Sequence, residues 1–108
     1  MEQKNETNTE AREVRLIDEA YQDLDDIFKF IAIDKLQPLN ARKVQEEIWD
    51  TINKIRKTPF AFKEYERTPT EGKLYRQARC LSWLIIYKIT SSEIVVLQIL
   101  HASKNYAK

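Results

Sequence analysis

The 108-residue sequence contains only one glycine and one cysteine, and each shortage excludes a class of protein. One glycine is too few for a glycine-rich phosphate loop, because such loops need several positions that tolerate a positive φ angle. The lone cysteine, Cys80, cannot form an internal disulfide, and the chain lacks the cysteine and histidine set of a structural zinc site. This cysteine usage suits a reducing compartment, so we expect a cytoplasmic protein with no metal and no other cofactor.

Long apolar stretches are missing as well. The N-terminal segment MEQKNETNTEAREV is polar and acidic, so it lacks the apolar core of a secretory signal. No uninterrupted apolar run approaches the length of a membrane span, and we expect no association with a membrane. Apolar residues make up 43% of the chain and charged residues 32%, a globular balance. We therefore expect one domain at residues 13–108, preceded by a flexible arm at residues 1–12.

The charges are distributed unevenly along the chain, although the net charge is only +1. Residues 18–34 carry six acidic side chains and one lysine, which gives −5. Residues 54–79 carry eight basic and three acidic side chains, which gives +5. Such a chain can present a basic surface to an anionic partner, but ordinary solvated surface charges give the same pattern. Both interpretations stay open at this point.

The first third of the chain has the pattern of a short strand followed by an amphipathic helix. Residues 14–17 are the strand candidate. Asp18 is the expected N-cap, and Glu19 in the first turn favours the positive end of the helix. The apolar stripe at helical spacing consists of Ala20, Leu24, Ile27, Phe28 and Ile31.

A second helix is expected after a break at residues 35–38. Asn40 is its expected N-cap, and Leu39 is placed to pack against Val44 as a hydrophobic staple. Pro59 ends the helix. Its apolar stripe consists of Ala41, Val44, Ile48, Ile52 and Ile55. Two helices joined by a short break should form an antiparallel hairpin.

The remainder of the chain predicts a loop and three strands. Residues 59–73 hold two of the three prolines and the only glycine, and we expect an ordered loop held by Phe60, Phe62 and Tyr65. Strands are expected at residues 74–81, 83–89 and 94–100, with a turn at residues 91–92. The order is β-α-α-β-β-β. This predicts the α+β class, with a helical hairpin packed on a mostly antiparallel sheet and a C-terminal three-stranded meander.

Most familiar catalytic patterns are absent from the sequence. It contains no GxSxG elbow, P-loop, HExxH helix or EF-hand loop. Asp23, Asp25 and Asp26 form an acidic cluster, but neighbouring helical carboxylates point away from one another around the axis. We therefore interpret this cluster as a solvated helix face and not as a metal site.

The candidate functional residues lie on the expected sheet and beyond its last strand. They are Arg76, Arg79, Trp83, Tyr87, His101, Lys104 and Tyr106. Arg76 and Arg79 fall on adjacent faces of one strand, and arginine captures phosphate or carboxylate groups through forked hydrogen bonds. Histidine titrates near neutrality, and aromatic rings stack on bases. A purely structural role is the alternative for each: local hydrogen bonding for His101, and sheet packing for Trp83 and Tyr87. Cys80 is expected to be a small buried apolar residue.

Three segments carry a resemblance to a known family. They are residues 75–80 (YRQARC), 83–87 (WLIIY) and 94–101 (IVVLQILH). In order and spacing they resemble the RelE/ParE superfamily of toxin–antitoxin toxins, and the resemblance covers residues 14–106. The superfamily has the same β-α-α-β-β-β order that the periodicity predicts.

The resemblance implies a small toxin that is held silent by a cognate antitoxin. RelE-like members cut mRNA on the ribosome, whereas ParE-like members, of the plasmid stabilisation type, poison DNA gyrase. The nuclease members commonly carry an arginine three residues before the tyrosine of the penultimate strand. Here that tyrosine is Tyr87 and the earlier position is Leu84, which cannot stabilise a phosphate. The near-neutral net charge and the closer similarity of residues 78–80 and 99–101 also favour a ParE-like inhibitor of DNA gyrase.

Two alternatives remain open. In a RelE-like nuclease acting on the ribosome and its mRNA, Arg76 or Arg79 would hold the scissile phosphate, and His101 or Tyr106 would act as acid or base. The other alternative is an inactive family member or plain interaction module. For a binding protein, we expect the surface for target or antitoxin to comprise all seven candidate residues. A homodimer or a toxin–antitoxin hetero-oligomer is the expected assembly.

Overall fold

The computed structural model describes residues 12–103, and its elements follow the predicted order. In chain order they are β1 (Glu13–Leu16), α2 (Asp18–Lys29), the π-helical turn η1 (Phe30–Asp34), α3 (Pro38–Lys57), the 3₁₀ turn η2 (Pro59–Ala61), β2 (Lys63–Glu64), β3 (Tyr75–Cys80), β4 (Trp83–Ile89) and β5 (Glu93–His101). The predicted arm at residues 1–12 lies outside the described residues, except for Arg12.

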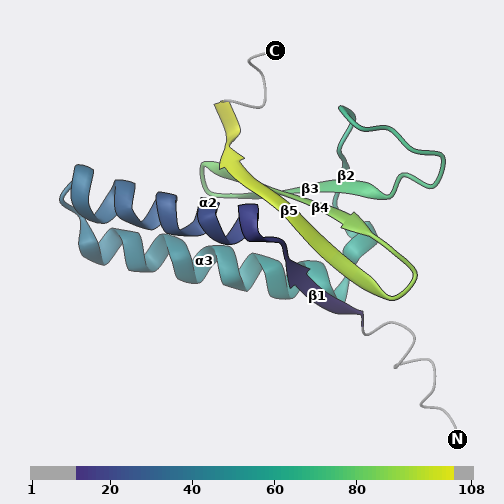
Figure 1. Ribbon diagram of the computed structural model, residues 1–108, viewed down its shortest axis with the longest axis horizontal. Coiled ribbons are helices and arrows are strands. Elements are labelled where there is room, and N and C mark those ends of the chain that lie inside the picture. The colour runs from purple at the N-terminus through teal and green to yellow at the C-terminus, as the bar shows by residue number, and fades with distance from the viewer. Residues whose placement is uncertain (1–11, 104–108) are drawn as a thin grey trace, which may run out of the picture.

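Five strands form one sheet in the order β1-β5-β4-β3-β2 (Figure 1). β1 runs parallel to β5, and the other neighbours are antiparallel. The predicted α+β fold with a C-terminal meander is therefore confirmed. β2 is an addition to the prediction, because two residues, Lys63 and Glu64, are too few to show an alternating pattern.

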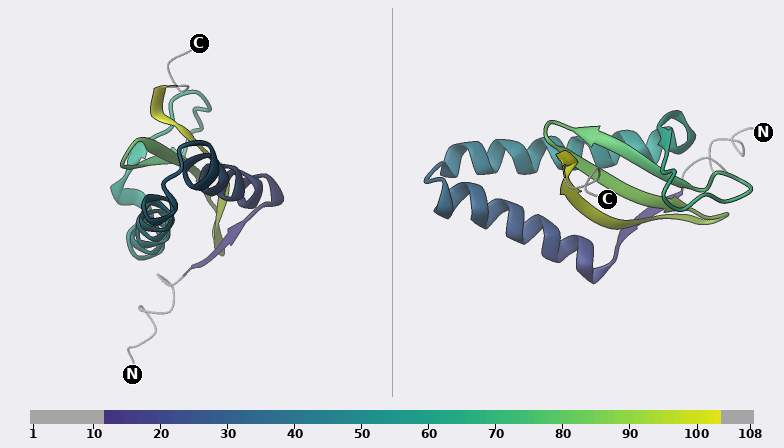
Figure 2. Two further views of the ribbon diagram at one scale, coloured as in Figure 1. Left: turned by 90° about the vertical axis from the view of Figure 1, so that its left-hand side faces the viewer. Right: turned by 90° about the horizontal axis from the view of Figure 1, so that it is seen from above.

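The helical hairpin covers one face of the sheet and extends beyond the sheet at its tip (Figures 1 and 2). α2 lies against β5, and α3 lies against β3. The core between these layers contains the predicted apolar stripes of both helices. Its largest fully buried side chains are Tyr87, Ile48, Ile55, Ile85, Ile89, Ile94 and Val96. Burial of each aliphatic side chain stabilises the fold by about 1.5–3 kcal/mol relative to exposure.

Both predicted helix starts are wrong, that of α2 by one residue and that of α3 by three. The N-cap of α2 is Ile17 in an extended conformation, and Asp18 is the first helical residue. α3 begins at Pro38, because proline suits the first helical position, where no N–H bond is needed. Asn40 therefore lies inside the helix, where it donates to the Gln37 side chain at 3.2 Å. The earlier start turns Leu39 outward, so it is 80% exposed and does not form the predicted staple.

The hairpin turn leaves several large apolar side chains exposed. α2 continues into η1, and the chain then reverses at Leu36, which has a φ of 56°. Gln37 N–H donates to the Ile31 carbonyl at 3.0 Å and closes the turn. The exposed side chains at this tip are Phe30, Ile33, Leu36 and Leu39. We refer to these four residues as the hairpin-tip patch.

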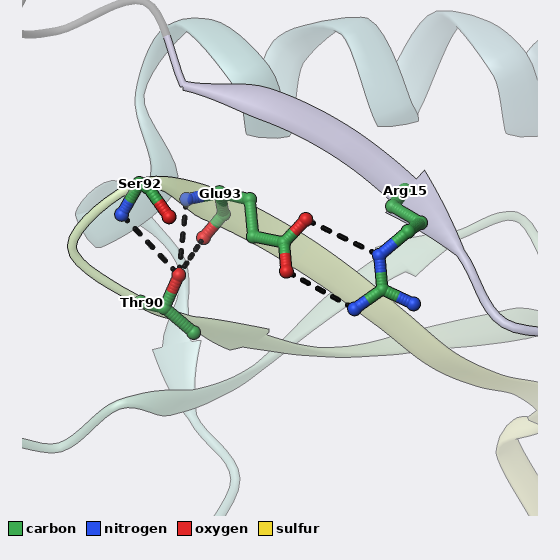
Figure 3. Close-up of polar contacts among 4 residues, drawn as sticks. All are labelled: Arg15, Thr90, Ser92 and Glu93. Carbon is green, nitrogen blue, oxygen red and sulfur yellow. Dashed lines mark hydrogen bonds and ion pairs between the residues drawn. The ribbon is translucent and has the colours of Figure 1, made fainter.

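The turn between β4 and β5 forms without glycine and is joined to β1 (Figure 3). The Thr90 hydroxyl accepts the N–H groups of Ser92 (3.3 Å) and Glu93 (3.0 Å). Arg15 on β1 donates two hydrogen bonds to the Glu93 carboxylate, at 3.2 and 3.0 Å. These bonds lower the pKa of Glu93 and raise that of Arg15. Arg12 Nε also donates to the Thr90 carbonyl, at 2.8 Å, so side chains hold β1 beside this turn.

Candidate functional site at the β3–β4 turn

The two arginines of β3 lie on opposite faces of the sheet, which corrects the prediction that they share one site. Side chains alternate along a strand, and Ala78 and Cys80 belong to the core beneath the helices. Arg76 therefore lies on the helix side and Arg79 on the other side. Lys104 and Tyr106, the two predicted site residues of the C-terminal tail, lie outside the described residues.

Arg76 holds the segment between α3 and β3. Its Nε donates to the Lys73 carbonyl at 2.8 Å, and Nη1 donates to the carbonyls of Phe60 (2.8 Å) and Phe62 (2.9 Å). The guanidinium also lies over the Phe60 ring, 5.1 Å from its centroid. Three backbone carbonyls thus fix this side chain. This geometry is that of a structural clamp, and we leave Arg76 out of the candidate site.

Tyr87 belongs to the core, so its predicted place on a binding surface is wrong. The side chain has no exposed area, and its hydroxyl donates to the Pro59 carbonyl at 2.6 Å. The Phe62 ring meets it edge to face, with centroids 6.4 Å apart. Burial raises the pKa of the phenol. The register explains the position, because Tyr87 pairs with Arg76 and Val96 in the middle of the helix-covered face.

Trp83 and His101 meet at the other end of the sheet. They are directly opposite on β4 and β5, and their rings form an edge-to-face pair with centroids 5.2 Å apart. Ser103 N–H donates to His101 Nδ1 at 3.2 Å, and the Ser103 hydroxyl lies 2.8 Å from the same nitrogen. Because Nδ1 accepts a bond, the neutral ring carries its proton on Nε2. His101 can therefore donate from Nε2 while Ser103 fixes its orientation.

The β3–β4 turn brings Arg79 to this end of the sheet. Arg79 Nε donates to the carbonyl of Leu81 at 2.6 Å, which is the only hydrogen bond of the Arg79 side chain among residues 12–103. Leu81 adopts a φ of 56° and is 54% exposed at the tip of the turn. Ala102 N–H donates to the Ser82 carbonyl at 2.8 Å and ties the end of β5 to this turn. We define Arg79, Leu81, Trp83 and His101 as the turn-end surface, which includes parts of both faces of the sheet, because Arg79 lies on the face opposite Trp83 and His101.

A groove of about 510 Å³ adjoins this surface between α2 and β5. Its lining residues are Asp23, Asp26, Ile27, Phe30, Trp83, Gln98, Ile99, Leu100 and His101. Asp23 Oδ2 accepts the Ile99 N–H at 2.8 Å, in place of a strand carbonyl. The prediction of a solvated helix face is therefore wrong for Asp23, because this contact joins residues 76 positions apart and no local pattern indicates it. No cluster of metal-binding side chains is present within residues 12–103.

Leu84 fills the position at which the resemblance places a nuclease arginine. It is 4% exposed and lies in a small apolar cluster with Ile86 and Ala102. Tyr65 and Leu100 pack against the same cluster. Leu84 itself therefore supplies packed hydrocarbon and no cation, and Arg79, its cross-strand partner on β3, is the arginine that lies on the same face.

The described helices include none with the length and apolar character needed to span a lipid bilayer. No protein of curated function matches the sequence.

Solved structures share the fold. The chromosomal ParDE TA system from P. aeruginosa superposes with a TM-score of 0.66 at 17% identity, over 85% of this chain and 97% of that one. The E. coli DinJ–YafQ toxin–antitoxin complex superposes with a TM-score of 0.53 at 15% identity, over 90% of this chain and 99% of that one. At these identities the likeness concerns the fold. The family model for the ParE toxin of the type II toxin–antitoxin system parDE matches residues 14–106, and the chain therefore belongs to the ParE toxin family.

Proposed function

We propose that this chain is a toxin that inhibits DNA gyrase in the cytoplasm by binding to it, and that a cognate antitoxin protein keeps it silent. The observation that carries the proposal is the family match over residues 14–106. The arrangement of the candidate residues supports binding over catalysis.

A metal-independent nuclease needs an acid, a base and a cation around a single phosphate. Here the candidate groups are dispersed. Arg76 is fixed by carbonyls, and Arg79 lies on the face opposite Ala78 and the core. Arg76 lies four positions before Cys80, the cross-strand partner of Trp83, which corresponds to about 13 Å along a strand. His101 therefore has no described arginine positioned with it around a common phosphate.

The turn-end surface has the composition of a protein-binding site. Arginine and tryptophan are the side chains that most often dominate binding energy at interfaces. An exposed leucine at the tip of a tight turn adds an apolar anchor, and Arg79 keeps donors that a partner can engage. We assign this surface to the gyrase contact.

The hairpin-tip patch is a second, separate surface suited to a partner. Soluble monomers rarely leave several large apolar side chains exposed side by side. Leu36 is 81% exposed and Ile33 is 63% exposed. We propose that the antitoxin covers this patch in a toxin–antitoxin hetero-oligomer. Both structural relatives named above are toxin–antitoxin systems, which supports this expectation.

A RelE-like nuclease is the second candidate, and one observation favours it. His101 has a defined tautomer with an N–H on Nε2, next to Trp83, which is an arrangement suited to proton transfer beside a stacked base. In that case the ribosome and its mRNA would be the partners.

Two assays with the purified chain separate the candidates. We expect DNA supercoiling by gyrase to be inhibited, while the message on programmed ribosomes stays intact. Arg79→Gln and Trp83→Ala should weaken the inhibition at least tenfold, whereas Arg42→Gln, on the exposed side of α3, should not. Cleaved message with normal supercoiling would establish the nuclease, and neither effect would favour an inactive family member.

Pulse labelling after induction of the chain in bacteria tests the same choice in cells. Gyrase inhibition predicts that DNA synthesis falls before protein synthesis. The opposite order would reject the gyrase proposal.

A further inference from the structure

One cationic region of the chain belongs to neither the turn-end surface nor the hairpin-tip patch. Residues 51–63 include four basic side chains and no acidic one. Three of the four are exposed in the last turn of α3, namely Lys54, Arg56 and Lys57. This turn, the start of β1 and the β4–β5 turn lie at the end of the molecule opposite the hairpin tip (Figures 1 and 2). The region is therefore a separate part of the surface.

Arg56 and Lys57 have no carboxylate to balance them. The positions three and four residues before each hold no acidic side chain, and neither residue forms an ion pair within residues 12–103. Lys29 on α2 shows the contrast, because Asp25 lies four residues before it and pairs with it at 2.9 Å. The dipole of α3 favours cations in its last turn, so these two residues alone do not define a binding site.

Arg12, which precedes β1, brings a further cation to this region. Its guanidinium lies over the Phe60 ring, 5.7 Å from the centroid, and Arg76 lies over the same ring at 5.1 Å. The Arg12 Nε donates to the Thr90 carbonyl, but neither Nη group donates a hydrogen bond to any residue from 12 to 103. Among the described residues, Glu64 is the acidic cross-strand neighbour of Arg76, and it makes no ion pair with either arginine. The fold thus gathers uncompensated cations from segments far apart in the sequence.

We define Arg12, Arg56, Lys57 and Phe60 as the α3-end surface, and its composition is that of a nucleic-acid contact. Protein–protein interfaces have an apolar centre, whereas interfaces with DNA are polar and strongly basic. Phe60 is 49% exposed and is the only large apolar side chain exposed between residues 50 and 64. Guanidinium groups already lie against its ring, so little of the ring remains for stacking on a base. These features favour the phosphate backbone of a duplex over a protein partner or a single strand.

We propose that the α3-end surface binds duplex DNA through its phosphate groups and without selecting a base sequence. Arg56 and Lys57 contact phosphates from exposed positions, and the free Nη groups of Arg12 donate forked hydrogen bonds to another phosphate. Phe60 positions the Arg12 guanidinium. This binding involves neither gyrase nor the antitoxin, so the inference does not rest on the proposed function.

Fluorescence anisotropy of a labelled DNA duplex of about 20 base pairs tests the proposal with the purified full-length chain. We expect saturable binding at about 25 mM salt, with a Kd of about 10–100 µM, and equal affinity for two duplexes of unrelated sequence. The logarithm of the binding constant should fall linearly with the logarithm of the salt concentration, with a slope of about −2.5 to −3, because three phosphate contacts contribute about 0.9 each. Tighter binding of single-stranded DNA of equal length, or equally effective competition by polyglutamate at the same charge concentration, would overturn the assignment to duplex DNA.

Matched charge variants locate the surface. The double variant Arg56→Gln/Lys57→Gln should weaken binding about tenfold at low salt and reduce the steepness of the salt dependence by about 2. Arg12→Gln should weaken binding about threefold and reduce the steepness by about 1. The control is Arg42→Gln/Lys43→Gln, which removes the same charge from exposed positions near the other end of α3 and should weaken binding less than threefold.

Circular dichroism and thermal unfolding confirm that the variants keep the fold. Equal losses in the two double variants, or no saturable binding by the unaltered chain, would overturn the proposal. Because the assay contains no gyrase, either result leaves the gyrase proposal untouched.

Discussion

The two ends of the sheet use arginine in different ways. At the end with the β4–β5 turn, the donors of Arg12, Arg15 and Arg76 bind backbone carbonyls or the Glu93 carboxylate. At the end with the β3–β4 turn, Arg79 makes one bond to its own turn. The first end is held together by charged side chains, and the second leaves charge and rings exposed. An arginine in a sequence thus becomes a candidate for binding only where the fold leaves its donors available.

The largest expected contrast is between the two arginines of β3. Arg76→Met removes three hydrogen bonds and leaves the carbonyls of Phe60, Phe62 and Lys73 without this donor. Because bonds to charged groups are worth about 1.5–3 kcal/mol each and their losses are not additive, we expect the free energy of unfolding to fall by about 2–3 kcal/mol. Arg79→Met should change it by less than about 0.5 kcal/mol. Urea unfolding followed by circular dichroism measures both free energies. If the two variants lose equal stability, Arg76 is not a structural clamp of the kind described above.

The Tyr87 hydroxyl gives the next largest effect. Tyr87→Phe keeps the packed ring but leaves the buried Pro59 carbonyl unpaired, so we expect a loss of about 1–2 kcal/mol in urea unfolding. The matched control is Tyr21→Phe, because Tyr21 is exposed on α2. A neutral outcome for Tyr87→Phe would mean that another donor satisfies this carbonyl.

The raised pKa of Tyr87 predicts how stability changes at alkaline pH. Burial raises the pKa of Tyr87 in the folded protein above its ordinary value of about 10. Above that pH the unfolded chain has lost the proton and the folded chain still holds it, so stability should decline as pH rises. Tyr87→Phe should flatten this decline between pH 10 and pH 11, measured as thermal unfolding at each pH. An unchanged slope would show that other groups cause it.

Substitution of Asp23 tests whether its hydrogen bond to Ile99 stabilises the end of the sheet that carries the β3–β4 turn. Asp23→Ala leaves the Ile99 N–H without its acceptor, and we expect the free energy of unfolding to fall by about 1–2 kcal/mol. Asp25→Ala is the control and should cost less than about 0.5 kcal/mol, because it removes only an exposed helical ion pair. Hydrogen exchange at the Ile99 amide should accelerate only in Asp23→Ala. Unchanged protection of that amide would contradict this role.

The smallest effect is expected from Arg15 and Glu93, which lie on the surface. Their contact lowers the pKa of Glu93 below its ordinary value of 4.5. The contribution to stability is therefore present above that pH and is lost as pH falls further and the folded carboxylate takes up its proton. Glu93→Gln should reduce this acid dependence slightly, and high salt should diminish the difference. A large difference between the two proteins in thermal unfolding would contradict the surface assignment.

Much of the fold could be predicted because its signals are local. The stripes of both helices and the bounds of β4 follow from side-chain periodicity, and the structure confirms them. The predicted start of α3 is wrong because Pro38 occupies the first helical position, so the helix begins before Asn40. The candidate site was less accessible to sequence reasoning. Arg76 contacts the Phe62 carbonyl, Tyr87 the Pro59 carbonyl and Asp23 the Ile99 amide, across 14 to 76 positions of the sequence, which no local pattern encodes.

The parallel pairing of β1 with β5 has a consequence for synthesis of the chain. It joins residues 80 positions apart, and β5 lies between β1 and β4 in the sheet. The ribosome synthesises the N-terminal segments first. β1 can therefore pair, and α2 can pack, in their native positions only after β5 has been synthesised. Contacts of such long sequence separation also slow folding. The complete sheet, the groove and the turn-end surface therefore assemble only after β5 has been synthesised, and a nascent chain without β5 lacks all three.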